Sequence, residues 1–270
     1  MRLGKAALAM AAVLALGGGC SLDRRVFHFP RPAYAEPRAG DVVFHAADGT
    51  RLHGRFFPAR AANGASVLYM HGNAQIVDDV DVDWLTDAGF HVLAFDGRGY
   101  GHSEERPRDR EGMLMDARAA FRALRRQPGV DPARVGVVGW SMGGTFALLL
   151  AAHEPEVRAV VSFAAFASWQ GVAHDFVPVA PLLLINPGLD PSSSIRRVRC
   201  PILIVHGTRD SVVRVHHGRT LLAAAREASR DVRAVFLENW SHDVIYGARP
   251  AAIAHLRAAL LGEVNAPSRP

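Results

Sequence analysis

A serine at the centre of a glycine-flanked turn is the first feature of this 270-residue chain that indicates chemistry. Residues 139–143 read Gly-Trp-Ser-Met-Gly, follow the apolar run 135–138 and precede a helical pattern. The Gly-x-Ser-x-Gly nucleophile elbow requires this strand–turn–helix context, because the sharp turn lifts the serine hydroxyl out of the backbone and a flanking side chain would crowd the neighbouring chain. We therefore predict that Ser141 is a nucleophile; a purely structural turn is the alternative.

A serine hydroxyl is a weak nucleophile, so it needs a histidine to accept its proton and an acid to orient that histidine. In enzymes with this elbow, the acid and then the histidine follow the serine along the chain. Asp210 lies just past the apolar run 201–205, and His242 lies past the run 233–237. We predict Asp210 as the acid and His242 as the base. The alternatives are, for the acid, Asp175, Asp190 and Glu238 and, for the base, His255.

Negative charge on a reacting carbonyl oxygen needs hydrogen-bond donors, and two backbone N–H groups usually supply them. One belongs to the residue after the nucleophile, which is Met142 here. The other comes from the turn after the third strand, where residues 71–73, His-Gly-Asn, follow the apolar run 66–70. We predict that the N–H groups of Asn73 and Met142 form an oxyanion hole. For residues 71–73 a plain turn is the alternative.

The elements that carry these residues alternate along the chain. Short runs rich in Val, Leu and Ile, typical of strands buried on both faces, cover residues 66–70, 90–95, 134–138, 157–163 and 201–205. Amphipathic segments typical of helices cover residues 75–88, 111–126, 142–153 and 214–227. Residues 42–45 and 52–57 flank Asp48-Gly49 and predict an antiparallel hairpin. The pattern predicts an α/β fold in which a mostly parallel sheet of about eight strands is flanked by helices.

A segment between two of these elements is the expected source of substrate specificity. Residues 169–194 contain an apolar core at 176–185 and lie where a cap is often inserted into such a sheet. One interpretation of this segment is that it holds an acyl chain. The alternative is a helix that only closes the core. We predict one catalytic domain over residues 41–262 with this short cap insertion, followed by a tail over 263–270.

The beginning of the chain predicts export. Residues 1–5 are short and basic, and residues 6–19 form an apolar stretch too short to cross a bilayer comfortably. The stretch ends in Gly-Gly-Gly-Cys-Ser, which resembles the lipobox of bacterial lipoproteins. We expect a signal peptide over 1–19, a lipid on Cys20 that anchors the protein to a membrane of the bacterial cell envelope, and a tether over 20–40. Ordinary secretory cleavage, which would give a soluble periplasmic or secreted protein, and an uncleaved anchor are the alternatives.

The composition narrows the possible partners. Hydrophobic residues make up 49% of the chain and charged residues 21%, which fits a globular protein with a substantial core. Arginines are scattered without interleaved aromatic residues, so nucleic acid is not an expected partner.

Metal and cofactor motifs are not expected either. The aspartates in 78–83 do not fit a calcium loop, because Trp84 and Phe90 stand where its glycine and glutamate would be; they are expected to begin a helix. The glycine-rich residues 96–101 do not fit a dinucleotide fingerprint and predict a structural turn beside the pocket. We expect no metal and no cofactor. Cys200 precedes an apolar run and is expected to be a buried thiol rather than a nucleophile.

With these residues placed, the chain from about residue 42 to 261 resembles the α/β-hydrolase superfamily, and more narrowly the serine hydrolases related to Bem46 and the protein depalmitoylases. The shared motifs are His-Gly-Asn at 71–73, Asp-x-Arg-Gly-x-Gly-x-Ser at 96–103, Gly-x-Ser-x-Gly-Gly at 139–144, His-Gly-Thr-x-Asp at 206–210 and Ser-His at 241–242. The resemblance implies hydrolysis of a small-molecule carboxylic ester or thioester through an acyl-enzyme, without a cofactor. It does not transfer a substrate, because this superfamily hosts many on one scaffold.

Two other interpretations stay open. A serine peptidase or aminopeptidase-like hydrolase would use the same three catalytic residues. A non-catalytic binding module on the same fold would be expected to have lost one of them. The oligomeric state is unknown from the sequence.

Overall fold

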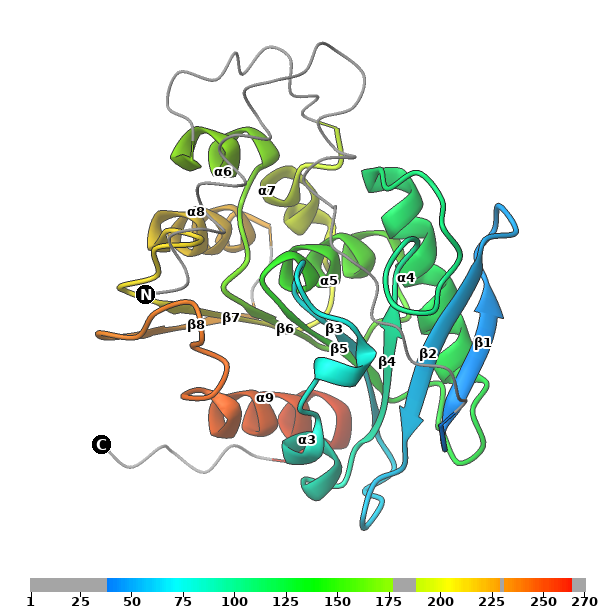
Figure 1. The fold of residues 1–270 in the computed structure, drawn as a ribbon. Helices are drawn as coiled ribbons and strands as arrows, with labels where there is room; N and C mark the ends of the chain where they lie inside the picture. The colour runs from blue at the N-terminus through cyan, green and yellow to red at the C-terminus, as the bar shows by residue number, and fades with distance from the viewer. Residues whose placement is uncertain (1–37, 177–187, 229–230, 264–270) are drawn as a thin grey trace.

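An eight-stranded sheet in the order β1-β2-β4-β3-β5-β6-β7-β8 runs through the protein (Figure 1). The computed structural model describes residues 38–176, 188–228 and 231–263. The strands are β1 (Asp41–His45), β2 (Arg51–Phe57), β3 (Ser66–Met70), β4 (His91–Asp96), β5 (Val135–Trp140), β6 (Val160–Phe163), β7 (Ile202–Gly207) and β8 (Val232–Leu237). In this part of the chain β2 pairs antiparallel with β1 and β4, and all other pairs are parallel. The predicted hairpin and parallel sheet are therefore confirmed.

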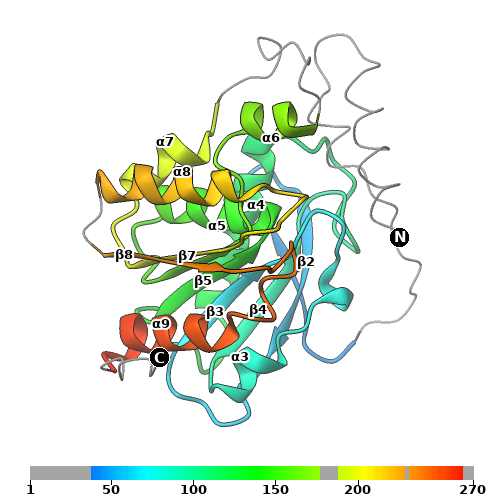
Figure 2. The same ribbon diagram turned by 90° about the vertical axis from the view of Figure 1, so that its left-hand side faces the viewer.

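Helices cover both faces of the sheet, as the two views show (Figures 1 and 2). The helices are α3 (Asp83–Asp87), α4 (Arg110–Arg125), α5 (Met142–His153), α6 (Trp169–Phe176), α7 (Pro191–Ser194), α8 (Val215–Arg226) and α9 (Arg249–Leu261). Figure 2 shows α4, α5 and α8 on one face, with α6 and α7 on the same side, and α3 and α9 on the other. Strands β3, β5 and β6 are buried almost throughout because both of their faces are covered.

The parallel connections place the functional candidates at one edge of the sheet. Chain segments that follow parallel strands leave the sheet at the same, carboxyl edge. The segments that contain residues 71–73, Ser141 and Asp210 follow β3, β5 and β7, and the segment with His242 follows β8. Most predicted elements begin and end within one or two residues of the observed ones.

One predicted helix was wrong. Residues 75–88 do not form one amphipathic helix but a single 3₁₀ turn, Val77–Asp79, followed by the short helix α3. Val80 is extended, with φ −82° and ψ 133°, and breaks the helical path. The Val77 N–H donates to the Asp96 carboxylate instead of joining a helix (2.9 Å). The aspartates of this run accept hydrogen bonds from nearby backbone N–H groups. Such local bonds compete with a helix, so the acidic run forms separate short turns instead of the start of one long helix.

A second boundary also differs from the sequence pattern. Strand β6 begins at Val160 rather than at 157, because the Val157 N–H closes a turn onto the carbonyl of Glu154 (3.1 Å). The segment predicted as a cap, 169–194, begins with α6 and ends with α7. Most of its apolar core, residues 177–185, lies outside the described residues, so the cap stays a prediction.

Among the residues that the structure describes, none lies in a helix with the length and apolar character needed to span a bilayer. Cys20, the predicted signal peptide, most of the tether and most of the tail fall outside the described ranges. The Cys200 side chain is partly buried at the entry to β7, and burial raises the pKa of its thiol to about 12. This thiol stays protonated near neutral pH, which suits the small apolar role predicted for it.

Candidate active site

Ser141 lies in a strained turn between β5 and α5. Its backbone has φ 58° and ψ −121°, a region that a residue with a side chain adopts only where the surroundings enforce it. Such a conformation costs about 1 to 3 kcal/mol. The Ser141 N–H donates to the carbonyl of Phe163 at the end of β6 (2.8 Å), and α5 begins at the next residue. The turn thus has the geometry of the predicted nucleophile elbow.

The two glycines of the motif make this turn possible by their lack of a side chain. A Cβ on Gly139 would lie 2.2 Å from the carbonyl oxygen of Gly143. A Cβ on Gly143 would lie 2.1 Å from the carbonyl oxygen of Met70, at the end of β3. These distances are far shorter than van der Waals contact. The two glycines therefore let the two ends of the elbow lie against each other and against the end of β3.

Asp210 and His242 form the pair that the sequence predicted. His242 Nδ1 lies 2.8 Å from Asp210 Oδ2. The other carboxylate oxygen accepts backbone N–H bonds from Val212 (2.8 Å) and Val213 (2.9 Å). The Asp210 carboxylate is completely buried, whereas the His242 side chain keeps 16% of its surface exposed. The aspartate is therefore fixed on one side by its own loop and presents its second oxygen to the imidazole.

His206 supports the loop that carries the acid. Its Nε2–H donates to the carbonyl of Val213 (2.7 Å), and Nε2 lies 3.5 Å from Asp210 Oδ2. Burial lowers the pKa of His206, which favours the neutral ring. In the sequence this histidine was visible only as the first residue of the motif at 206–210, and its position four residues before the acid was the available signal.

Trp140 connects the serine elbow to the histidine loop. Its indole N–H donates to the backbone carbonyl of His242 (2.8 Å), and the two rings have centroids 5.1 Å apart. Because Ser141 is the next residue, the loop that carries His242 is tied directly to the elbow. No role was predicted for Trp140 from the sequence. A large aromatic residue in the first variable position of the motif was the signal.

The segment predicted to complete the oxyanion hole lies against the elbow. A Cβ on Gly143 would also lie 2.5 Å from the carbonyl oxygen of His71, so the end of β3 and the first turn of α5 are in contact. Met142 is the buried first residue of α5. Asn73 is half-buried, two residues beyond His71. The structure thus brings the two predicted donor segments to the same place.

The rival acids and base lie elsewhere. Asp190 accepts a hydrogen bond within its own turn at α7. Glu238 accepts one from the hydroxyl of Thr208 (3.3 Å), and His255 is buried on α9. Asp210 and His242 contact each other, whereas these hydrogen bonds of Asp190 and Glu238, and the burial of His255 on α9, involve other parts of the chain.

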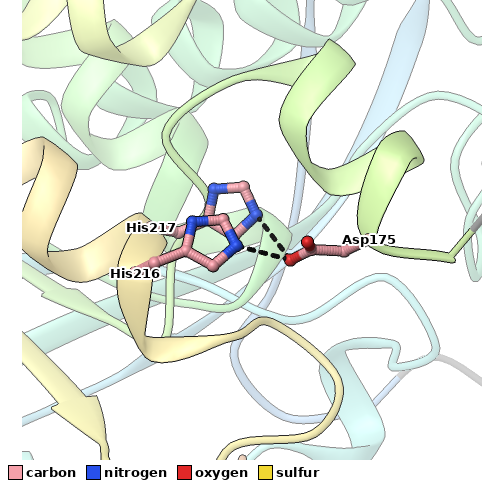
Figure 3. A group of neighbouring side chains, drawn as sticks. All are labelled: Asp175, His216 and His217. Atoms are coloured by element: carbon pink, nitrogen blue, oxygen red, sulfur yellow. Dashed lines mark hydrogen bonds and ion pairs between the residues drawn. The ribbon is translucent and has the colours of Figure 1, made fainter. Parts of the chain in front are cut away.

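Asp175, the remaining rival acid, belongs to a second cluster (Figure 3). Its Oδ2 lies 2.8 Å from His216 Nε2 and 3.3 Å from His217 Nε2. These three side chains, from α6 and the first turn of α8, place one ligand atom each within 4.8 Å of one another, which resembles a metal site. However, the Ala167 N–H donates to His217 Nδ1 (3.2 Å), so the proton of this neutral ring lies on Nε2. In this tautomer the nitrogen that faces Asp175 has no lone pair for a metal ion.

Comparison with known proteins places the chain in a family. The model of the prolyl oligopeptidase family, Peptidase_S9, matches residues 77–262. The chain belongs to this family. The uncharacterized protein YfhR of Salmonella typhi is 32% identical over 250 residues, which are 85% of this chain and 81% of YfhR. The lysophosphatidylserine lipase ABHD12 of Mus musculus is 31% identical over 218 residues, 70% of this chain and 54% of that protein.

A solved structure shows the same fold. The esterase Pf2001 of Pyrococcus furiosus superposes with a TM-score of 0.72 at 18% identity, and the match covers 86% of this chain and 98% of the esterase. The predicted α/β-hydrolase fold is therefore confirmed. Family and fold together identify the protein as a serine hydrolase in the general sense.

Proposed function

We propose that this protein cleaves carboxylic ester or thioester bonds through an acyl-enzyme, as a member of the Bem46-related and depalmitoylase-like branch of serine hydrolases. Ser141 Oγ attacks the acyl carbonyl while His242 takes its proton and then returns it to the leaving group. Asp210 holds the tautomer in which His242 Nε2 accepts that proton. The backbone N–H groups of Asn73 and Met142 bind the oxygen as it becomes negative. No cofactor takes part in these steps.

The observation that carries this proposal is the pairing of His242 Nδ1 with the buried Asp210 at 2.8 Å, on a loop that Trp140 ties to the strained Ser141 turn. A catalytic histidine needs its Nδ1–H held by an acid so that Nε2 is left to exchange protons with the nucleophile. All three predicted residues are present in the chain, which argues against the non-catalytic binding module.

The choice of an ester or thioester over a peptide bond draws on two supports. ABHD12 is named a lysophosphatidylserine lipase and Pf2001 an esterase. In addition, the segment between β6 and β7 contains the apolar sequence run 176–185, which suits an acyl chain. The family name keeps peptide hydrolysis as the alternative function.

A matched substrate series tests the proposal. We expect the protein to hydrolyse p-nitrophenyl esters of graded acyl length and the corresponding acyl thioesters, with kcat/KM far above that for aminoacyl and dipeptidyl p-nitroanilides. A preference for the anilides would favour the peptidase. If the protein turned over neither class and a fluorophosphonate probe failed to label it, the binding module would be favoured instead.

We also propose that a lipid on Cys20 anchors the protein to a membrane of the bacterial cell envelope after removal of residues 1–19. The lipobox-like end of the apolar stretch supports this location. Cys20→Ser should abolish metabolic labelling by a radioactive fatty acid and either release the protein from membranes or leave the precursor uncleaved. A mature N-terminus beyond residue 20, read by mass spectrometry, would exclude the lipid anchor.

A further inference from the structure

The turn after β4 contains a buried tyrosine that the proposed mechanism does not use. Residues 96–101 were predicted to form a structural turn, and their backbone is tightly fixed. Gly99 and Gly101 have φ of 74° and 47°, and a Cβ on Gly101 would lie 2.1 Å from the carboxylate of Asp96. These two glycines flank Tyr100, so the position of the tyrosine is set on both sides.

Asp96 connects this turn to the segment that follows β3. Its carboxylate is fully buried, accepts the Val77 N–H (2.9 Å), and lies 3.2 Å from His53 Nδ1 and 3.5 Å from His71 Nε2. Burial alone would raise the pKa of Asp96, but the hydrogen bonds from His53 and His71 hold it well below its ordinary value. The turn at 96–101 and the segment at 71–73 therefore both pack against the same ionised carboxylate, that of Asp96.

Tyr100 reaches from this anchored turn to Asn73. Its O–H donates to Asn73 Oδ1 (2.5 Å), and its ring lies edge-on to His71 with centroids 5.8 Å apart. The side chain is only 3% exposed, and this burial raises the pKa of the phenol. Tyr100 therefore stays protonated near neutral pH, and its hydroxyl remains a donor to Asn73.

The backbone around Asn73 is held in a compact turn. The Gly72 N–H donates to Gln75 Oε1, and the Gln75 N–H donates back to the Gly72 carbonyl, each at 3.1 Å. The turn fixes the two sides of Asn73, and Tyr100 fixes the far end of its side chain. The direction of the Asn73 N–H is set by the backbone dihedrals at residues 72 and 73, and an asparagine held at both places has less freedom to change them.

We propose that Tyr100 is a positioning residue for the oxyanion hole: its hydroxyl fixes the Asn73 side chain and so aims the Asn73 N–H at the acyl oxygen. This inference rests on the proposed function, because it takes Asn73 as a donor. Preorganised donors lower the barrier because they need no rearrangement as charge develops. Loosening Asn73 therefore affects the transition state more than substrate binding.

The test is a double-mutant cycle between Tyr100 and Asn73. Tyr100→Phe removes the donor, and Asn73→Ala removes the acceptor but keeps the backbone N–H. We expect each variant to lower kcat for a p-nitrophenyl ester about tenfold with KM nearly unchanged. The double variant should lose no more than either single one, because both changes break the same bond. Tyr69→Phe in β3, where the tyrosine is also 3% exposed, is the matched control and should keep its kcat.

The outcomes separate this inference from the proposed function. If the wild type is active and Ser141-dependent but Tyr100→Phe keeps its kcat, or if the two losses multiply, Tyr100 does not position Asn73. If the wild type cleaves no ester or thioester, the proposed function fails and the inference fails with it. Melting temperatures of all variants show which losses come from misfolding. Should Tyr100→Phe not fold, Asn73→Ala with full kcat would overturn the inference alone.

Discussion

The molecule contains two clusters of aspartate and histidine that use the same residue types in different ways. In each, a carboxylate oxygen lies 2.8 Å from an imidazole nitrogen: Asp210 with His242, and Asp175 with His216. At the first cluster the acid is completely buried and its histidine is partly exposed. At the second, one histidine is half-exposed and the other, His217, is 2% exposed.

The difference lies in which ring nitrogen faces the acid. His242 gives Nδ1 to Asp210, so Nε2 is left for proton exchange, next to an elbow that carries a serine. His216 and His217 both turn Nε2 toward Asp175, and the Nδ1 lone pair of His217 is taken by the Ala167 N–H. The second cluster therefore has the composition of a catalytic or metal site but serves to join α6 to α8. The tautomer set by the surroundings, rather than the residue types, separates the two.

The largest expected effect comes from Ser141, the serine of the elbow that Trp140 ties to the first cluster. Ser141→Ala should lower ester turnover about 10³-fold or more and abolish labelling by a fluorophosphonate, with the fold intact. The matched control is Ser168→Ala beside the second cluster, where the hydroxyl accepts the Gly171 N–H at the start of α6 (2.9 Å). The control should keep both activity and labelling. Undiminished labelling of Ser141→Ala would remove the functional distinction between the clusters.

The next effect compares the two acids directly. Asp210→Asn removes the carboxylate that holds the tautomer of His242, and kcat should fall about 10² to 10⁴-fold. Asp175→Asn weakens a contact between α6 and α8 and should leave kcat within about twofold. Both variants are measured with one p-nitrophenyl ester, and circular dichroism checks their folding. A loss at Asp175→Asn with near-normal kcat at Asp210→Asn would mean that the catalytic acid had been misplaced.

The sequence predicted what depends on short stretches of chain. Local patterns identify the glycine-flanked elbow, the strands, and the acid and histidine just beyond strand ends. A parallel sheet then places the carboxyl ends of its strands at one edge, independently of the loop conformations. For this reason the contact between Asp210 and His242 was predictable. The helix expected over residues 75–88 was not confirmed, because the N–H of Val77 bonds to Asp96, which comes after that segment in the chain.

Contacts that depend on the path of a loop could not be predicted from the sequence. Asp175 meets His216 across 41 positions, Tyr100 meets Asn73 across 27, and the Trp140 indole meets His242 across 102. Each depends on the way a loop leaves the sheet, and loop paths follow from tertiary packing rather than from periodicity. The tautomer of His217 likewise follows from one backbone N–H that no residue pattern identifies.

The smallest effect tests whether His217 is held neutral, as the comparison requires. Burial, and then the nearby His216, lower the pKa of His217 to about 4, against an ordinary value of 6.5. The unfolded chain takes up this proton as the pH falls through about 6.5, whereas the folded protein resists it until about 4. His217 therefore contributes stability above about pH 6.5, and that contribution, up to about 3 kcal/mol, is lost progressively as the pH falls toward 4.

Urea unfolding of His217→Asn measures this loss, because the asparagine oxygen can replace Nδ1 as the acceptor for Ala167 without titrating. The free energy of unfolding of the wild type should fall more steeply than that of His217→Asn between about pH 7 and about pH 4.5. His216→Asn is the control: this ring is 52% exposed, so the variant should keep most of the wild-type slope. The buried His206 and His255, whose pKa values are also lowered by burial, remain in both variants and contribute equally. Equal slopes for the wild type and His217→Asn would show that His217 takes up a proton as readily in the folded protein as in the unfolded chain. That result would contradict the neutral ring inferred from the Ala167 N–H contact.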